Sequence, residues 1–255
     1  MISIVIALIF SSTSVNQNYS TDVDVVARCA LIYITLLFVG VVGMMSVQPV
    51  VFSDRPAFYR EQFSNVYAVG LHTLASTLVE LPYLLISSIL FVIPFFFIVG
   101  FDNHGEVADQ FFFYWLFQGL YMSTLIFIGQ FYSTAMPSEA SSQMISGMTS
   151  TFLSLFCGFM IPSQSIPTFW LFIYWMNPLH YALEGLITTQ FNRDHTLLTL
   201  FSSSDQMTAQ DYVYTIFQQW SYKHRWVDFG VLVLFILLLR FSTYLASKYL
   251  RHDKR

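Results

Sequence analysis

Apolar residues in this chain are gathered into blocks that are long enough to cross a lipid bilayer. A helix needs about 20 apolar residues to span the ~30 Å hydrocarbon core. Of the 255 residues, 55% are hydrophobic and only 10% are charged, whereas soluble domains carry about a quarter charged residues. One water-facing globule cannot bury so many apolar residues. The sequence therefore predicts an all-α, polytopic integral membrane protein that is surrounded by lipid.

The apolar blocks predict one partial and five complete membrane-spanning helices. Residues 1–10 are apolar but only about half the length of a span, so we expect a truncated first helix whose beginning lies upstream. They lack the basic region that opens a signal peptide. The complete spans are predicted at residues 24–47, 77–98, 111–134, 143–161 and 227–247.

The distribution of lysine and arginine predicts the orientation of the chain. If the spans alternate, six cations fall on one side, and the two short loops on the other side carry none. Because cations are retained on the cytoplasmic side, this pattern predicts a cytoplasmic C-terminus. Arg240, about 20 Å along its helix from Val227, is expected to snorkel to the inner face. The six cations are Arg55, Arg60, Lys248, Arg251, Lys254 and Arg255.

The stretch from residue 148 to residue 191 breaks the helical pattern. Pro162 and Pro167 interrupt an apolar segment, a dense aromatic run follows, and Asn177-Pro178 opens another helical segment. Prolines this close together do not fit one continuous helix, because each lacks a donor and clashes with the preceding turn. We expect the fifth span to break near its outer end. Short, broken re-entrant helices would then follow within an outer loop over residues 162–225, as a lid over a pathway.

Residues 52–65, between the second and third spans, carry both signs of charge with aromatic residues between them. Phe58, Tyr59 and Phe63 are spaced to form one face of a short helix on the inner surface. The segment is either an interfacial anchor or a docking surface for a partner domain. The spacing by itself favours the anchor.

Glu80 lies just inside the inner boundary of the third span, where an unpaired carboxylate is costly. Two interpretations stay open for this residue. Its side chain reaches back to water at the inner face, or it belongs to a polar relay that joins the inner loop to the helices and pairs with an arginine. Ionisable groups inside a membrane are functional candidates in either case.

Sequence motifs of common enzymes are missing from the chain. No Walker A motif, HExxH, CxxC or GxSxG occurs. His180 and Glu184 lie one helical turn apart, but without a third ligand they indicate a pair on a helix face rather than a metal site. We therefore expect no catalysis, no metal, no cofactor bound by this chain and no nucleic-acid partner.

Several ordered motifs, spread over nearly the whole chain, closely resemble the membrane domain of G-subfamily ABC transporters. The closest resemblance is to the C-terminal membrane half of full-size pleiotropic-drug-resistance transporters. Cys157-Gly158 departs from the usual Ser-Gly, and the family's outer-loop cysteines are absent. The motifs are Ser46-Val-Gln-Pro-Val-Val51, Phe58-Tyr-Arg-Glu61, Val79-Glu-Leu-Pro-Tyr83, Gly158-Phe-Met-Ile-Pro162, Ile166-Pro167, Tyr174-Trp175, Asn177-Pro178 and Gly185 through Gln190-Phe191.

The resemblance implies a six-helix transmembrane domain of the ABC-2 exporter type, in the plasma membrane. It would pair with a second such domain, in the same polypeptide or in another chain. A nucleotide-binding domain outside these 255 residues would bind ATP and magnesium. Residues 52–65 resemble the coupling helix, which strengthens the docking interpretation, and Glu80 matches the glutamate of the family's polar relay. The matching coupling residues are Arg55, Phe58, Tyr59, Arg60 and Glu61.

The resemblance also implies a substrate cavity between the second and fifth helices, closed above by an upper plug where the fifth helix breaks. The plug positions are Phe159 and Met160. The cavity positions are Phe38, Val42, Thr151, Ser154 and Leu155.

Three functions are consistent with these expectations. The first is the permease part of an ATP-driven exporter that moves hydrophobic or amphipathic small molecules or lipids out of the cytoplasm or the inner leaflet. The second is a nucleotide-independent channel or lipid scramblase, which is disfavoured because the spans hold scattered Ser and Thr rather than aligned charged rings. The third is an inactive truncated fragment.

Overall fold

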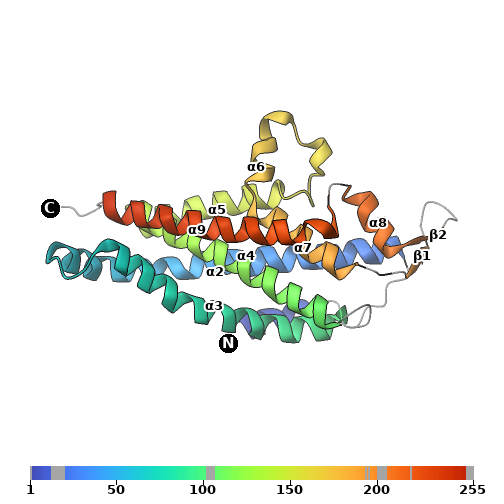
Figure 1. Ribbon diagram of the computed structural model, residues 1–255, viewed down its shortest axis with the longest axis horizontal. Helices are drawn as coiled ribbons and strands as arrows, with labels where there is room; N and C mark the ends of the chain where they lie inside the picture. The colour runs from blue at the N-terminus through green and yellow to red at the C-terminus, as the bar shows by residue number, and fades with distance from the viewer. Residues whose placement is uncertain are drawn as a thin grey trace.

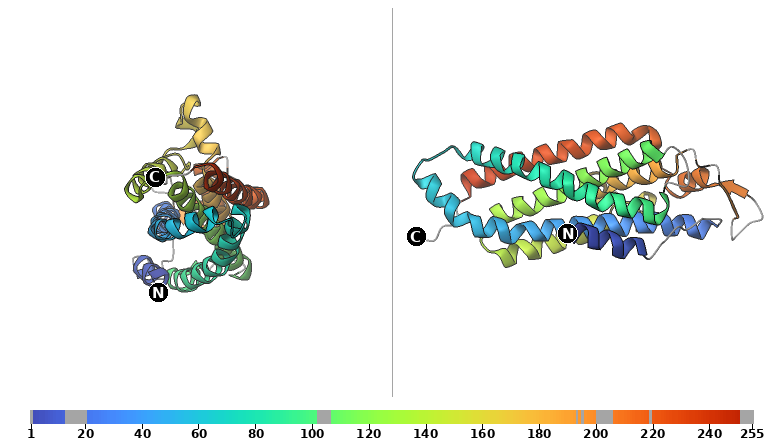
Figure 2. Two further views of the ribbon diagram at one scale, coloured as in Figure 1. Left: turned by 90° about the vertical axis from the view of Figure 1, so that its left-hand side faces the viewer. Right: turned by 90° about the horizontal axis from the view of Figure 1, so that it is seen from below.

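The chain folds into an elongated bundle of helices with a small hairpin at one end, as Figures 1 and 2 show. The structure, a computed structural model, describes residues 2–12, 21–101, 107–192, 194, 196–199, 206–218 and 220–250. Four helices in this part of the chain are long and apolar enough to cross a membrane, which confirms the all-α membrane class. They are α2 (Asp22–Phe63), α3 (Val69–Val99), α4 (Val107–Ala135) and α9 (Arg225–Tyr249), the last with its preceding turn.

Shorter elements complete the described part of the chain. Strands β1 and β2 form an antiparallel hairpin in which Leu198 lies opposite Met207. We call this the hairpin end of the bundle, and the opposite end, where α2 stops, the Phe63 end. The shorter elements are α1 (Ile2–Ser12), α5 (Glu139–Leu155), η2 (Ser163–Ser165), η3 (Thr168–Trp170), α6 (Leu171–Trp175), α7 (Pro178–Gln190), β1 (Leu197–Thr199), β2 (Gln206–Thr208), α8 (Ala209–Ile216) and η4 (Tyr222–His224).

Helix α2 corrects the expectation of a separate short helix or loop at residues 52–65. It runs without a break from a capping box, in which Thr21 and Asp24 bond each other, to Phe63. Pro49 and Pro56 lie inside it. Each proline removes one intrahelical bond but does not by itself end a helix that tertiary contacts hold. The helix ends where Asn65 takes a positive φ of 50°.

Helix α3 is also longer than expected. It is continuous from Val69 to Val99, whereas the sequence suggested a separate approach helix before a span at residues 77–98. Pro82 and Pro94 lie within it, and Gly100 ends it in the left-handed conformation with φ 80°. Glycine adopts this conformation at no steric cost.

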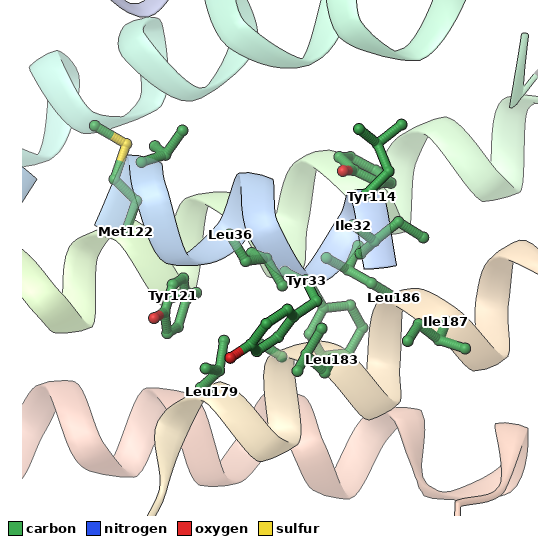
Figure 3. Packing of buried hydrophobic residues seen from close by; sticks show 14 of the residues in the cluster. Ile32, Tyr33, Leu36, Tyr114, Tyr121, Met122, Leu179, Leu183, Leu186 and Ile187 are labelled. Carbon is green, nitrogen blue, oxygen red and sulfur yellow. The ribbon is translucent and has the colours of Figure 1, made fainter. Parts of the chain in front are cut away.

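The core surrounds α4, which packs against α2, α3, α7 and α9. Figure 3 shows side chains from α2, α4 and α7 meeting there, including Leu36, Tyr121 and Leu183, all three of which are fully buried. Backbones approach closely where α2 crosses α4. A Cβ placed on Gly129 would lie 2.4 Å from the carbonyl oxygen of Met44, so only glycine fits this crossing.

Helix α5 ends at Leu155, before the predicted end of its span at residue 161. The break is set by Gly158, whose φ of +92° belongs to the left-handed region, rather than by Pro162. The segment η2, η3 and α6 then projects from the side of the bundle (Figures 1 and 2). Asn177 returns the chain by accepting from the Leu179 amide at 2.9 Å and donating to the Leu153 carbonyl at 2.7 Å.

Candidate functional site

The last turns of α2 are fastened to neighbouring helices by Arg55. Its guanidinium donates to the carbonyl oxygens of Ser133, of Met136 at 2.8 Å and of Pro137 at 3.5 Å, and it lies over the Phe52 ring. These acceptors belong to the end of α4 and to the turn before α5. This part of α2 is therefore tied by hydrogen bonds to α4 and to the start of α5.

The other predicted coupling residues divide between a buried base and an exposed tip. Phe58 is buried, with its ring 4.5 Å from that of His72, and Tyr59 is half-buried. Phe58 therefore packs inside the bundle and does not face lipid as part of an interfacial anchor. Arg60 and Glu61 are exposed and form what we call the charged tip.

Glu61 fixes the loop that follows α2. Its Oε2 accepts from the Tyr67 hydroxyl at 2.6 Å. This hydrogen bond raises the pKa of Tyr67 to about 12, because the phenol must stay protonated to donate to the carboxylate. The charged tip is thus held in one position relative to the start of α3.

Arg55→Ala is expected to lower the stability of the chain more than Arg60→Ala. The first change leaves three backbone acceptors without their cationic donor. At a half-buried site this should lower the free energy of unfolding by about 1–2 kcal/mol. Within the described part of the chain, Arg60 donates to Pro56 alone, in its own helix and at 3.3 Å, so its loss should cost less than about 0.5 kcal/mol. Equilibrium unfolding of the purified chain in mixed micelles measures both. Equal losses would contradict the fastening role of Arg55.

A buried polar network lies deeper in the bundle and joins α3, α4 and α9. Gln130 of α4 donates to Glu80 of α3 at 3.1 Å and accepts from Arg240 of α9 at 2.7 Å. Glu80 is therefore linked to an arginine through a glutamine, and its role in a relay stays a prediction. We call these three residues the relay cluster.

Arg240 differs from its expected position. Its side chain does not extend to the end of the bundle but is only 9% exposed, with its guanidinium 3.5 Å above the centre of the Phe127 ring. The reason is the partner available inside the bundle, since Gln130 supplies an acceptor and Glu80 a negative charge. A charged group pairs where a partner exists and snorkels where none does.

One cavity of about 200 Å³ joins the relay cluster to the base of the coupling segment. Its lining includes Arg55 and Phe58 from α2 and all three side chains of the relay cluster. The sequence identified Glu80 and the coupling residues separately, and it missed Gln130. A neutral glutamine in an apolar helix carries no charge signal that could reveal it.

The predicted substrate-cavity residues lie on α2 and α5. Helix α5 packs on α2, where the Tyr33 hydroxyl donates to the Ser154 carbonyl at 3.1 Å. Thr151 is exposed, and Leu155 is 38% exposed. On α2, Val42 is half-buried, and the 46% exposed Phe38 lies 5.2 Å from the Phe10 ring of α1. The α5 positions are thus on the α2–α5 flank, whereas Phe38 faces α1.

The predicted plug residues follow the break in α5. Phe159 stacks between Tyr33, at 4.8 Å, and Phe217, at 5.9 Å, while Met160 is 58% exposed. A cavity of about 370 Å³ lies beside Phe159 and extends to Trp220. Of the two predicted plug residues, Phe159 is therefore packed between rings and Met160 is exposed.

The fold and these sites define a helical membrane domain whose buried polar network shares a cavity with the last turns of its longest helix. The family model for the ABC-2 type transporter matches residues 1–191, and that for the CDR ABC transporter matches residues 199–255. The chain belongs to the ABC-2 type transporter family. It is a membrane permease domain of the G-subfamily, pleiotropic-drug-resistance type, rather than an ATPase domain.

Curated relatives include plant transporters of this type. ABC transporter G family member 53 of Oryza sativa is 31% identical over 258 residues, which cover 99% of this chain. Pleiotropic drug resistance protein 1 of Petunia hybrida is 27% identical over 250 residues, or 95% of the chain. The chain spans only 17% and 16% of the lengths of these relatives. Membership of the family implies, in general, a nucleotide-binding domain as partner.

Proposed function

We propose that the chain is the transmembrane part of an ATP-driven exporter of hydrophobic or amphipathic small molecules or lipids. The cavity that joins Arg55 and Phe58 to the relay cluster carries this proposal. The cavity is lined by residues of all four long helices, α2, α3, α4 and α9, and so places the last turns of α2 beside the other three. ATP and magnesium would be bound by the nucleotide-binding partner, and this chain would bind neither.

The protein would lie in the plasma membrane, with the Phe63 end facing the cytoplasm. Arg55, Arg60 and Lys248 lie at this end, close to the ends of spans, where the positive-inside rule applies. Lys223 and Arg225 lie at the hairpin end but follow a long loop, where the rule is weak. The C-terminal cations from Arg251 onward lie outside the described residues.

The substrate would move along the flank of α2 and α5, completed by a second membrane domain. Leu155 gives this flank exposed apolar surface, and Thr151 and Ser154 add hydroxyl groups. Apolar walls with few directional groups bind many hydrophobic shapes weakly, so broad specificity is expected. Phe159 and Met160 would close the path at the hairpin end.

Replacing both Arg60 and Glu61 with alanine is expected to uncouple transport from ATP hydrolysis. The exposed side chains of the tip hydrogen-bond to neighbouring segments, Pro56 in the same helix and Tyr67 in the following loop, so folding and membrane insertion should be retained. Efflux should fall by about tenfold or more while ATP hydrolysis continues, because force no longer reaches α2. The measurement is ATP-driven efflux of a hydrophobic dye from vesicles in which the chain is assembled with a nucleotide-binding domain.

The matched control is the Glu139→Gln, Lys248→Gln double variant. It also removes one anion and one cation at the Phe63 end, but outside the coupling segment. Control efflux should stay within about twofold of the unmodified chain. Unchanged efflux in the tip variant would refute the coupling assignment. Equal flux in vesicles without ATP would instead indicate a channel or scramblase.

A further inference from the structure

A separate cavity of about 210 Å³ lies at the hairpin end, where α6, α7, η4 and α9 meet. Three aromatic rings, those of Tyr174, Trp175 and Tyr181, line it together with two carboxylates, Glu184 and Asp228. No lysine or arginine is among its lining residues. Nothing in the proposed transport path uses these side chains, although Tyr174 also lines the cavity beside Phe159.

Glu184 is held as an acceptor at the wall of this cavity. Its Oε1 accepts from the Ser221 amide at 3.1 Å and lies 3.1 Å from Nδ1 of His224, which comes from 40 residues further along the chain. The Glu184 side chain is 5% exposed, whereas that of His224 is 55% exposed. The cavity therefore has an exposed rim and a buried carboxylate inside.

Asp228 has one oxygen that meets no hydrogen-bond partner among the described residues. This atom is its Oδ2, and the residue is only 2% exposed. Burying an unpartnered polar atom is costly, most of all for a carboxylate oxygen. Such an atom at the wall of a cavity indicates that a ligand group belongs opposite it.

The charges define the class of that ligand. The lining holds two carboxylates and no lysine or arginine. A bound cation would favour the charged form of these carboxylates, so the site suits a cation. Among the described residues no group of three or more His, Cys, Asp or Glu side chains could hold a metal ion. The aromatic walls instead match an organic ammonium group, which rings attract through their electron-rich faces. The volume is below the range typical of drug-sized ligands.

We propose that this cavity binds a quaternary ammonium group of the trimethylammonium type. The rings of Tyr174, Trp175 and Tyr181 would surround its methyl groups, while Asp228 and Glu184 would balance its charge. The group could come from a free cation or from the headgroup of a choline lipid, which share this chemistry. The site is additional to the proposed exporter function and does not depend on it.

The test is equilibrium dialysis of radiolabelled choline against the purified chain in a detergent without choline groups. Competition by 3,3-dimethylbutan-1-ol, which has the same shape but no charge, isolates the effect of the cation. Unlabelled choline should compete at least about tenfold better than the alcohol. Equal competition by both, or no choline binding, would overturn the proposal.

Variants assign the binding to this cavity. Asp228→Asn, which keeps the size of the side chain, should weaken choline binding by about tenfold, and Trp175→Leu should weaken it severalfold. Asp22→Asn removes a carboxylate at the same end of the bundle but off the cavity and should have no effect. Circular dichroism confirms that each variant is folded. Equal affinity in the folded Asp228 variant and the Asp22 control would place the binding elsewhere and overturn the assignment.

Lipid discs distinguish the two sources of the ammonium group. If a lipid headgroup fills the cavity, discs of phosphatidylcholine should reduce choline binding relative to discs of phosphatidylglycerol. If the natural occupant is a free cation, binding should be the same in both. Either result supports the trimethylammonium site and names its source.

Discussion

Glu80→Leu is expected to destabilise the chain by about 3 kcal/mol, because it leaves the guanidinium of Arg240 buried without a counter-charge. Arg240 is 9% exposed and reaches Glu80 only through Gln130. Equilibrium unfolding of the purified chain in mixed micelles gives the free energy. Leucine replaces the carboxylate with apolar volume, so the loss reports the stranded charge rather than a cavity.

The second half of this test is rescue by Arg240→Met. With both charges gone, the remaining network is Gln130 alone, and the double variant should recover about half or more of the lost stability. Arg240→Met by itself should cost less than Glu80→Leu, because Glu80 is half-buried and lines a cavity. Additive losses in the double variant would show that the relay cluster is not energetically coupled.

Gly129→Ala is expected to cost about 2–3 kcal/mol by separating α2 from α4. The new Cβ would lie 2.4 Å from the Met44 carbonyl oxygen and 3.0 Å from Cγ1 of Val47. The first of these neighbours is backbone and cannot rotate away, so the two helices must shift. Thermal unfolding in detergent should show a clearly lower midpoint.

Gly230→Ala is the matched control. It makes the same chemical change in α9, where an added Cβ meets nothing within 4 Å. Alanine in a helix interior is better than glycine by about 0.5–1 kcal/mol, so this variant should be unchanged or slightly more stable. A loss at Gly230 equal to that at Gly129 would argue against close packing as the cause.

Apolar block length located the long helices, because a span must satisfy a fixed thickness of hydrocarbon. The predicted spans at residues 24–47, 77–98, 111–134 and 227–247 lie within α2, α3, α4 and α9. The cost of an unpaired buried carboxylate likewise indicated that Glu80 needs attention. Both features depend only on one segment or one residue and on the lipid or water around it, so the sequence reveals them.

Features that depend on distant partners were not predictable in the same way. The mixed charges and aromatic spacing suggested a separate short helix at residues 52–65, but this segment continues α2, and Arg55 holds it through acceptors about 80 residues away. The pairing of Glu184 with His224 and the partnerless oxygen of Asp228 also arise only when α7 and α9 are packed together. No local pattern encodes which of several polar residues will meet.

The uninterrupted course of α2 has a mechanical consequence for the proposed transporter. Its 42 residues extend roughly 63 Å at ~1.5 Å each, about twice the thickness of the hydrocarbon core. Met44, which meets Gly129 at the tight crossing, lies roughly 24 Å along the helix from Arg60 and roughly 9 Å from Phe38. In the proposed transporter, a displacement of the charged tip would pivot at this crossing and reach the wall beside Phe38 reduced by about the ratio of these two lengths.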